Sequence, residues 1–495
     1  MPLRDDQAAV LEQLREAVAE RKTRVCLQAP TGWGKTVFAS ALVESARDKD
    51  KKVLFTVPAI SLIDQTVEMF WDHGVVDVGV IQASHMMTNW SKPIQIASVQ
   101  TLQKRDMPEA DVVIVDECHR WFAAYGTWMH KDLGWKCPVV GLSATPWTKG
   151  LANHYDHFIR ASTTEELIEK GLLSPYRVFA PTHPDLSGVR TVAGDYHEGE
   201  LSAKMSDTAL VADAVSTWLR MSEGRPTLCY AVDRAHAKHL QAKFQASGVP
   251  CGYQDAETKD IDRKAVKRDF HSGTVKVVVS VGTLTTGIDW DVRCISMCRP
   301  TKSDMLFTQI VGRGLRTAEG KDHCLILDHS SNHSRLGFVT DVDASHTGLL
   351  GGKSPTHDNR TESIRLPKEC PQCAYLKPPR MAKCPHCGFV AEVVWTAKPV
   401  EGELRLLKPK PKQKALDHID KATFYAQLRG VEIQRGYRSG WAGNQYRDQY
   451  GEWPSPDMRG VAPIMNTSKE ILGWITSRQI AFRARKAKAK QLLGV

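Results

Sequence analysis

A glycine-rich turn, Ala29-Pro-Thr-Gly-Trp-Gly-Lys-Thr36, joins the apolar run Val25–Ala29 to the helical pattern Thr36–Arg47. This order of strand, turn and helix is the setting of a phosphate-binding loop. Gly32 and Gly34 would let backbone N–H groups approach a phosphate closely, because glycine has no side chain to obstruct them. The first turn of the following helix adds partial positive charge. The stretch therefore predicts a nucleotide site at the end of a buried strand.

Three polar side chains of this turn are candidate ligands. Lys35 would reach the β- and γ-phosphates of ATP, and the Thr36 hydroxyl would bind Mg²⁺. Thr31 lies in the same loop, and together with Gly32, Gly34, Lys35 and Thr36 it forms the loop's part of the predicted cofactor-binding set. ATP and Mg²⁺ are therefore the cofactors expected for this part of the chain.

The residues around the turn alternate β-rich apolar runs with helical patterns. Apolar runs without polar alternation are typical of parallel strands that are buried on both faces. The first series of expected strands comprises Val25–Ala29, Val53–Val57, Ile94–Ala97, Val112–Val115 and Val139–Leu142. A second series comprises Thr227–Ala231, Val275–Ser280, Cys294–Cys298 and Cys324–Asp328. The predicted fold class is α/β, with two tandem doubly wound parallel-sheet domains.

One of these runs ends in two acids, in the stretch Val112-Val-Ile-Val-Asp-Glu-Cys-His-Arg120. At the tip of the strand Asp116 could hold Mg²⁺, and Glu117 is placed to orient and deprotonate an attacking water. A pair of acids at a strand end could instead simply cap a helix. The phosphate loop upstream favours the catalytic interpretation.

These motifs resemble those of the superfamily 2 helicases and translocases. Asp116-Glu-Cys-His119 and Ser143-Ala-Thr-Pro146 carry the likeness, and further motifs of that superfamily follow in order. They are Leu3-Arg-Asp-Asp-Gln7, Thr56-Val-Pro-Ala-Ile-Ser-Leu62, Ala97-Ser-Val-Gln-Thr-Leu102, Val281-Gly-Thr-Leu-Thr-Thr-Gly-Ile-Asp289 and Gln309-Ile-Val-Gly-Arg-Gly-Leu-Arg316. The resemblance implies two RecA-like domains that bind ATP in the cleft between them.

The resemblance also implies roles for single residues. Gln7 would pair with the edge of adenine, and Asp289 would lie near the nucleotide. Gln309, Arg313 and Arg316 would complete the catalytic set from the second domain, because arginines there neutralise charge on the transferred phosphoryl group. Taken alone, both arginines could be ordinary charges on a helix surface. Coupling to nucleic acid is expected from His119, Ser143, Thr145, Pro58, Thr101 and Thr285.

Within the superfamily the chain resembles the RadD-like bacterial helicases over about residues 1–335. The likeness rests on Val115-Asp-Glu-Cys-His-Arg120, Leu284-Thr-Thr-Gly-Ile-Asp289, Arg299-Pro-Thr301 and Gln309–Arg316, leading to Asp322-His-Cys-Leu-Ile-Leu-Asp328. Two tryptophans depart from the usual pattern: Trp33 inside the phosphate loop and Trp147 after Pro146. The last third is more similar to the ends of phage-encoded helicases, in Gly440-Trp-Ala-Gly-Asn-Gln-Tyr446 and Gly451-Glu-Trp-Pro454. These features suggest a phage or bacterial origin.

Four cysteines form two Cys-x-x-Cys pairs, Cys370-Pro-Gln-Cys373 and Cys384-Pro-His-Cys387. Two such pairs suit tetrahedral Zn²⁺, with two thiolates from each tight turn. All four ligand positions would be filled, which indicates a structural rather than a catalytic metal. A redox pair is the alternative, and the duplication of the motif makes it the weaker one. Zn²⁺ is therefore the third expected cofactor.

Charge is distributed unevenly between the parts of the chain. Residues 361–495 contain 24 Lys and Arg against 12 Asp and Glu, whereas residues 1–360 contain 42 against 44. A basic region on a nearly neutral protein indicates a polyanionic partner, although a solvated tail would have the same composition. The tail also interleaves aromatics with arginines, which suits base stacking. Those aromatics could equally form the core of a small domain.

The expected organisation has five parts. Residues 1–160 and 175–345 would be the first and second RecA-like domains, and 346–366 a linker. Residues 367–392 would be a zinc ribbon, and 393–495 a small α-rich, basic region that binds nucleic acid or other proteins. No run of eighteen apolar residues occurs, so no membrane span and no membrane partner are expected. The N-terminal residues show no apolar leader, and we expect a cytoplasmic location in a bacterial or phage-infected cell.

We therefore expect an ATP-dependent DNA helicase or translocase, with single-stranded or forked DNA as its partner. Three other functions stay open. The chain could move on duplex DNA as a motor subunit that does not separate the strands. It could act on RNA, although Asp-Glu-Cys-His rather than Asp-Glu-Ala-Asp favours DNA slightly. It could also be a non-catalytic adaptor, which the complete set of catalytic residues disfavours.

Overall fold

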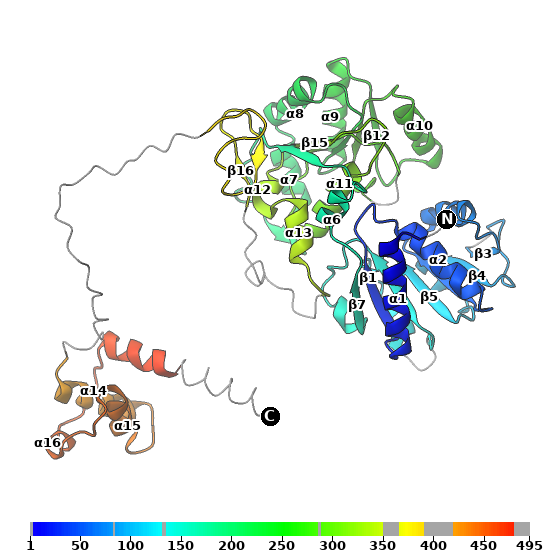
Figure 1. The fold of residues 1–495 in the computed structure, drawn as a ribbon. Coiled ribbons are helices and arrows are strands. Elements are labelled where there is room, and N and C mark those ends of the chain that lie inside the picture. The colour runs from blue at the N-terminus through cyan, green and yellow to red at the C-terminus, as the bar shows by residue number, and fades with distance from the viewer. Residues whose placement is uncertain are drawn as a thin grey trace. The chain divides into compact units, whose positions relative to one another are not determined.

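The computed structural model describes residues 3–82, 85–130, 135–285, 289–349, 366–390 and 419–479. The chain forms two units, Met1–Val393 and Val394–Val495. The first contains two parallel sheets, each flanked by helices, and a small cysteine-bearing ribbon, while the second is helical (Figure 1). Among the helices of these described ranges, none has the length and apolar character needed to cross a bilayer.

The first sheet is wholly parallel, with strand order β3-β4-β2-β5-β6-β1-β7. Its β-branched residues suit strands that helices cover on both faces. The strands are β1 (Arg24–Gln28), β2 (Val53–Val57), β3 (Val78–Ile81), β4 (Ile94–Ser98), β5 (Val112–Asp116), β6 (Val139–Ser143) and β7 (His157–Arg160). The helices are α1 (Asp5–Ala19), α2 (Lys35–Arg47), η1 (Ile60–Leu62), α3 (Ile63–Asp72), α4 (Val99–Leu102), α5 (Ala123–His130) and η2 (Leu151–Asn153).

The second sheet is also parallel, with strand order β12-β13-β11-β14-β15-β8. Its strands are β8 (Tyr176–Phe179), β11 (Thr227–Tyr230), β12 (Cys251–Gln254), β13 (Val277–Ser280), β14 (Cys294–Met297) and β15 (Cys324–Asp328). The helices in this part are α6 (Thr164–Glu169), α7 (Glu198–Met205), α8 (Thr208–Met221), α9 (Arg234–Ala246), α10 (Asp260–His271), α11 (Asp304–Gly314), α12 (Asn332–Leu336) and α13 (Val339–Ser345). A small hairpin of β9 (Thr191–Val192) and β10 (Asp195–Tyr196) follows β8 in the chain. The predicted pair of parallel-sheet α/β domains is confirmed.

The core does not stop at the boundary between the two sheets. One cluster of buried apolar residues includes Val25 and Phe55 of the first domain and Ile295 and Phe307 of the second. Leu173, which is 2% exposed in the crossover between the domains, belongs to the same cluster. Apolar burial therefore holds the two domains against each other, and it does so next to the carboxyl edge of the first sheet.

The ribbon is attached to an edge of the second sheet. It contains β16 (Lys368–Glu369) and β17 (Leu376–Lys377), and Tyr375 pairs with Phe179 at the end of β8. The Ala180 N–H donates to the Ala374 carbonyl at 3.0 Å, and the rings of Phe179 and Tyr375 meet edge-on at 5.3 Å. An unpaired edge strand is thereby covered.

The second unit has its own core. It contains α14 (Lys421–Gln434), α15 (Trp441–Tyr450), α16 (Pro456–Arg459) and a further helix over residues 469–479. Phe424 and Tyr446 are fully buried, and Ile471 and Ile475 pack with them. Either a core role or a base-stacking role was expected for the aromatics of the tail. In the described part of the tail most of them pack in this core, whereas Trp453 is 53% exposed.

Candidate active site and metal centre

The phosphate loop adopts backbone angles that only glycine takes easily. Gly32 has φ of 88°, and Gly34, the N-cap of α2, has φ of 92°. A Cβ on Gly32 would lie 2.3 Å from the Cδ2 atom of Leu173, so the crossover chain packs directly on the loop. The loop leads into α2, where Lys35 and Thr36 occupy the first turn. The geometry predicted for the turn is thus present.

The loop is held from behind by the start of α1. Gln7 is 1% exposed, and its amide nitrogen donates to the Trp33 carbonyl at 3.0 Å. The Arg4 guanidinium donates to the same carbonyl at 2.8 Å. Trp33 itself is fully buried and packs against Phe38, with ring centroids 5.3 Å apart. Trp33 therefore anchors the loop in the core, and the part of Gln7 in reading adenine stays a prediction.

The two acids stand at the carboxyl end of β5, across from the loop. Lys35 Nζ lies 3.5 Å from Glu117 Oε1, and Glu117 has a left-handed φ of 47°. Burial, and then the charge of Glu117, raises the pKa of Asp116 to about 7. Burial alone would raise the pKa of Glu117, but the nearby positive charges of Lys35 and Arg313, together with His119, lower it below its ordinary value. The pair is thus poised with different proton affinities, as functional acids often are.

His119 connects the acids to the end of β6 and to the second domain. Burial lowers its pKa to about 4, so the ring is neutral at ordinary pH. Its Nε2 accepts a hydrogen bond from the Gln309 amide at 3.1 Å, which leaves the proton on Nδ1, 2.8 Å from the Ser143 hydroxyl. Gln309 also donates to the Thr145 hydroxyl at 3.2 Å. Four predicted residues from three separate motifs therefore form one hydrogen-bonded chain.

Helix α11 faces the phosphate loop across the domain boundary. A Cβ on Gly312 would lie 3.1 Å from the Thr31 hydroxyl oxygen, which shows how closely the two segments approach. Arg313 is 6% exposed, and burial followed by the charge of Arg316 lowers its pKa to about 10. Arg316 pairs with the exposed Asp289 at 2.5 Å. Arg313 therefore stays charged near neutral pH, and it is the more deeply buried of the two arginines.

The remaining predicted residues lie at the same sheet edges but are not joined to this chain of contacts. Pro58 follows β2, and its carbonyl accepts from Gln100 at 2.8 Å. The Thr101 backbone N–H donates to the Ser98 hydroxyl at 3.2 Å in the first turn of α4. Thr285 is half-buried after β13. Their expected part in nucleic-acid coupling stays a prediction.

The donor set at this edge suits a nucleotide with its metal. A helix N-terminus and Lys35 supply positive charge, while Asp116 and the Thr36 hydroxyl are the hard oxygen donors that Mg²⁺ prefers. Glu117 and Arg313 lie around the same place from opposite domains. Of the residues that matter here, sequence reasoning did not single out Arg4 and Leu173, because only the folded chain brings them to the loop.

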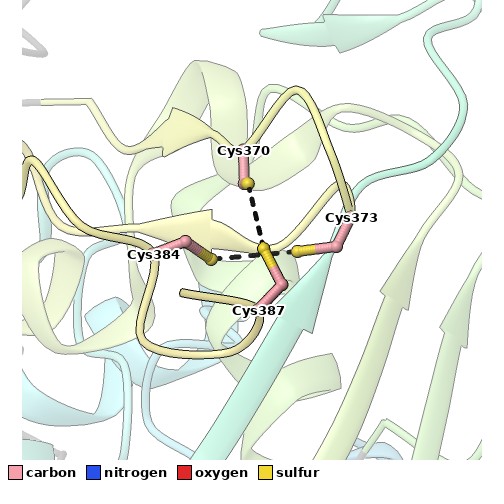
Figure 2. Close-up of side chains that lie close together, drawn as sticks. All are labelled: Cys370, Cys373, Cys384 and Cys387. Atoms are coloured by element: carbon pink, nitrogen blue, oxygen red, sulfur yellow. Dashed lines mark hydrogen bonds between the residues drawn. The ribbon is translucent and has the colours of Figure 1, made fainter. Parts of the chain in front are cut away.

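The ribbon gathers the four predicted cysteines at one point (Figure 2). Their sulfur atoms all lie within 4.8 Å of one another, with Cys370 and Cys387 at 3.7 Å and Cys373 and Cys384 at 3.8 Å. Tetrahedral Zn–S bonds of about 2.3 Å place sulfurs about 3.8 Å apart, so the arrangement fits Zn²⁺. Burial would raise the pKa of the Cys384 thiol, but backbone N–H groups of Cys387 and His386 lower it to about 7.

Comparison with known proteins relates both sheets to one class. Residues 1–148 match the family "Type III restriction enzyme, res subunit", and residues 210–318 match "Helicase conserved C-terminal domain". A 51.5 kDa protein of a Lactococcus phage is 28% identical over 79% of this chain and 84% of its own. The proposed ATP-dependent helicase IRC3 of Saccharomyces cerevisiae is 29% identical over 66% of this chain. The match spans about half of the length of that yeast protein, 51%.

Solved structures show the same fold at low sequence identity. A fragment of a proposed HsdR subunit of a Vibrio vulnificus type I restriction enzyme superposes with a TM-score of 0.53 and 21% identity. It covers 71% of this chain and 67% of its own. The Type ISP restriction-modification enzyme LlaBIII bound to DNA gives a TM-score of 0.51 and 20% identity, over 66% of this chain and 28% of its own. With its motifs in order on two RecA-like sheets, the chain belongs to the superfamily 2 helicases of the DEAD/DEAH type.

Proposed function

We propose that this protein hydrolyses ATP and uses the cycle to move along or unwind DNA. The observation that carries the proposal is the contact chain from Lys35 and Glu117 through His119 to Gln309, because it links the nucleotide loop to the second domain. ATP with Mg²⁺ would sit over Lys35 and Thr36, with Asp116 holding the metal through oxygen. Glu117 would take the proton of the attacking water. Arg313 and Arg316 would neutralise charge on the γ-phosphoryl group.

Movement would follow from the position of the site between two domains. Release of the phosphate cleaved from ATP removes the charge that Arg313 binds, so the second domain is freed from the first and can close again on new ATP. His119 and Thr145 contact residues on both sides of the nucleotide site. Through them, a change in the bound nucleotide would shift the segments expected to bind the nucleic-acid strand, around Pro58, Thr101 and Thr285. Each turnover would thus become one opening and closing of the two domains.

The proposed polymer is DNA, and the basic excess of the chain supports a polyanion in general. A specific observation favours a second candidate, a motor that moves on duplex DNA without separating its strands. The family matched by residues 1–148 takes its name from a restriction enzyme subunit. Zn²⁺ held by the four cysteines would be structural in either case.

The test compares ATP hydrolysis with single-stranded DNA, forked DNA, duplex DNA and RNA, and a strand-displacement assay runs beside it. We expect stimulation by DNA, and we expect Lys35→Ala to abolish turnover because the phosphates lose their cation. Lys51→Ala is the matched control, since Lys51 is exposed and, within the described part of the chain, forms its ion pair with Asp111 at 3.3 Å. If the Lys35→Ala variant still hydrolysed ATP, the assignment of the nucleotide site would be wrong. Stimulation by duplex without strand displacement would support the second candidate.

A further inference from the structure

A short helix beyond the second sheet contacts both domains. Helix α13 packs against α11 and against α6 of the crossover (Figure 1). Its Asp343 is 1% exposed and accepts hydrogen bonds from the Thr164 backbone N–H at 2.7 Å and from the Gln28 amide at 3.0 Å. Gln28 is the last residue of β1, directly before the phosphate loop. A carboxylate that follows the second sheet thus fixes the entry to the nucleotide site of the first.

The residue after α13 makes a second link. The ring of His346 stacks on Trp147 with centroids 4.0 Å apart and planes at 18°. Trp147 is 6% exposed and lies two residues after Thr145. His346 Nε2 also lies 3.6 Å from the carboxylate of Asp304, the first residue of α11. His346 is therefore placed between the exit of β6 and the start of the helix that carries Gln309 and Arg313.

We propose that Val339–His346 is a coupling element, and that Trp147 and His346 are positioning residues for Arg313. The start of α11 is held to β6 through the His346 ring, while Asp343 holds α13 to β1. Because α11 is a single rigid helix, fixing its start fixes where Arg313 lies relative to Glu117. This role accounts for the unusual tryptophan after Pro146, because the large ring of Trp147 provides the face on which His346 stacks. The inference rests on the proposed ATPase activity.

A packing role and a positioning role for His346 and Trp147 predict different effects of mutation on stability and kinetics. A packing role would lower stability and activity together, whereas a positioning role would lower kcat and leave the KM for ATP nearly unchanged. The phosphate loop binds ATP without help from His346, so only the arginine contact made during hydrolysis should suffer.

The experiment measures DNA-stimulated kcat, KM for ATP and thermal unfolding of full-length variants. We expect His346→Ala to lower kcat by about three- to tenfold, the factor that a stacked aromatic pair is worth. His346→Phe restores a ring over Trp147 but not the polar contact with Asp304, so its kcat should lie between those of His346→Ala and the unchanged protein. Trp147→Phe should likewise keep most of kcat, while Trp147→Ala should lose it.

His271→Ala is the matched control. His271 likewise lies at the C-terminal end of a helix beside a tryptophan, with its ring 6.1 Å from that of Trp290 and edge-on, but both residues lie within the second domain. We expect no change in kcat from this variant. The inference is overturned if His346→Ala keeps full kcat, or if its loss follows the drop in melting temperature and His346→Phe does not recover it. The Lys35→Ala variant is measured in parallel. If it loses ATP hydrolysis while His346→Ala keeps full kcat, the proposed activity stands and only the positioning role is wrong.

Discussion

Gly32 shows how much one residue position constrains the nucleotide loop. Its φ of 88° is costly for any residue with a side chain, and Leu173 fills the space where a Cβ would lie. Gly171, two residues before Leu173, has φ of 68°, but no atom lies within 4 Å of the position that its Cβ would take. The two glycines therefore separate backbone strain from steric exclusion at the contact between the crossover and the loop.

We predict that Gly32→Ala lowers stability by more than the roughly 1–2 kcal/mol of left-handed strain, because Leu173 must also move. ATP binding should fall as the loop shifts. Gly171→Ala should show the strain alone and keep its affinity for ATP. Thermal unfolding and nucleotide titration of both variants measure this. Equal losses in the two would mean that the contact with Leu173 does not constrain the loop.

Among the elements, the cysteine-bearing ribbon covers the free edge of a strand of the second sheet, β8. It pairs Tyr375 with Phe179, stacks Tyr375 on His386 at 5.9 Å, and joins Glu369 to His183 at 2.6 Å. These contacts lie at the end of β8, the outermost strand of the second sheet. The ribbon is thus part of the second domain's structure, and metal binding should contribute to the stability of that domain.

We predict that chelating Zn²⁺, or changing Cys384→Ser, lowers the melting temperature by more than about 4 °C, the shift expected from about 1–2 kcal/mol in a domain of this size. Hydrogen exchange should speed up in β8 and β15. Cys137→Ser, in the first domain and away from the ribbon, is the control. If the amides of β8 stayed fully protected from hydrogen exchange after metal removal, the ribbon would not contribute to the stability of the second sheet.

At the scale of the whole chain, the two units differ in charge. Residues 1–393 contain 47 Lys and Arg against 47 Asp and Glu, so the unit with both parallel-sheet domains has no formal net charge. Residues 394–495 contain 19 against 9 and carry the whole excess of +10. On the proposed function, we expect the second unit to supply the long-range attraction for a polyanion and the first unit to carry the chemistry.

We predict that a chain ending at Val393 keeps basal ATP hydrolysis but binds DNA more weakly, with a flatter dependence of affinity on salt. The reason is that fewer phosphate counterions are released when the basic unit is missing. Salt titrations of DNA binding by the full and shortened chains measure the slope. An unchanged slope would place the phosphate contacts on the two parallel-sheet domains instead. The terminal basic stretch around Arg483 belongs to this unit but lies outside the described residues.

The sequence by itself determined the central strands and the motif order. Val53–Val57 and Cys324–Asp328 were predicted with the bounds they have, because a strand buried on both faces is predominantly apolar. Four strands of the two large sheets were missed, and they are the edges of those sheets: β3, β7, β12 and β8. Edge strands are short or partly polar, and their pairing is decided by neighbours distant in sequence.

The same division holds for the site. Glycine spacing, strand-end acids and paired cysteines have local causes, so Lys35, Asp116 and Cys370 could be named from the chain alone. Contacts such as Gln309 with His119, Asp343 with Gln28 and His346 with Trp147 join residues 190, 315 and 199 positions apart. No local pattern encodes such pairs, because they form only when two separately folded sheets bury a shared apolar surface. The tertiary structure alone decided them.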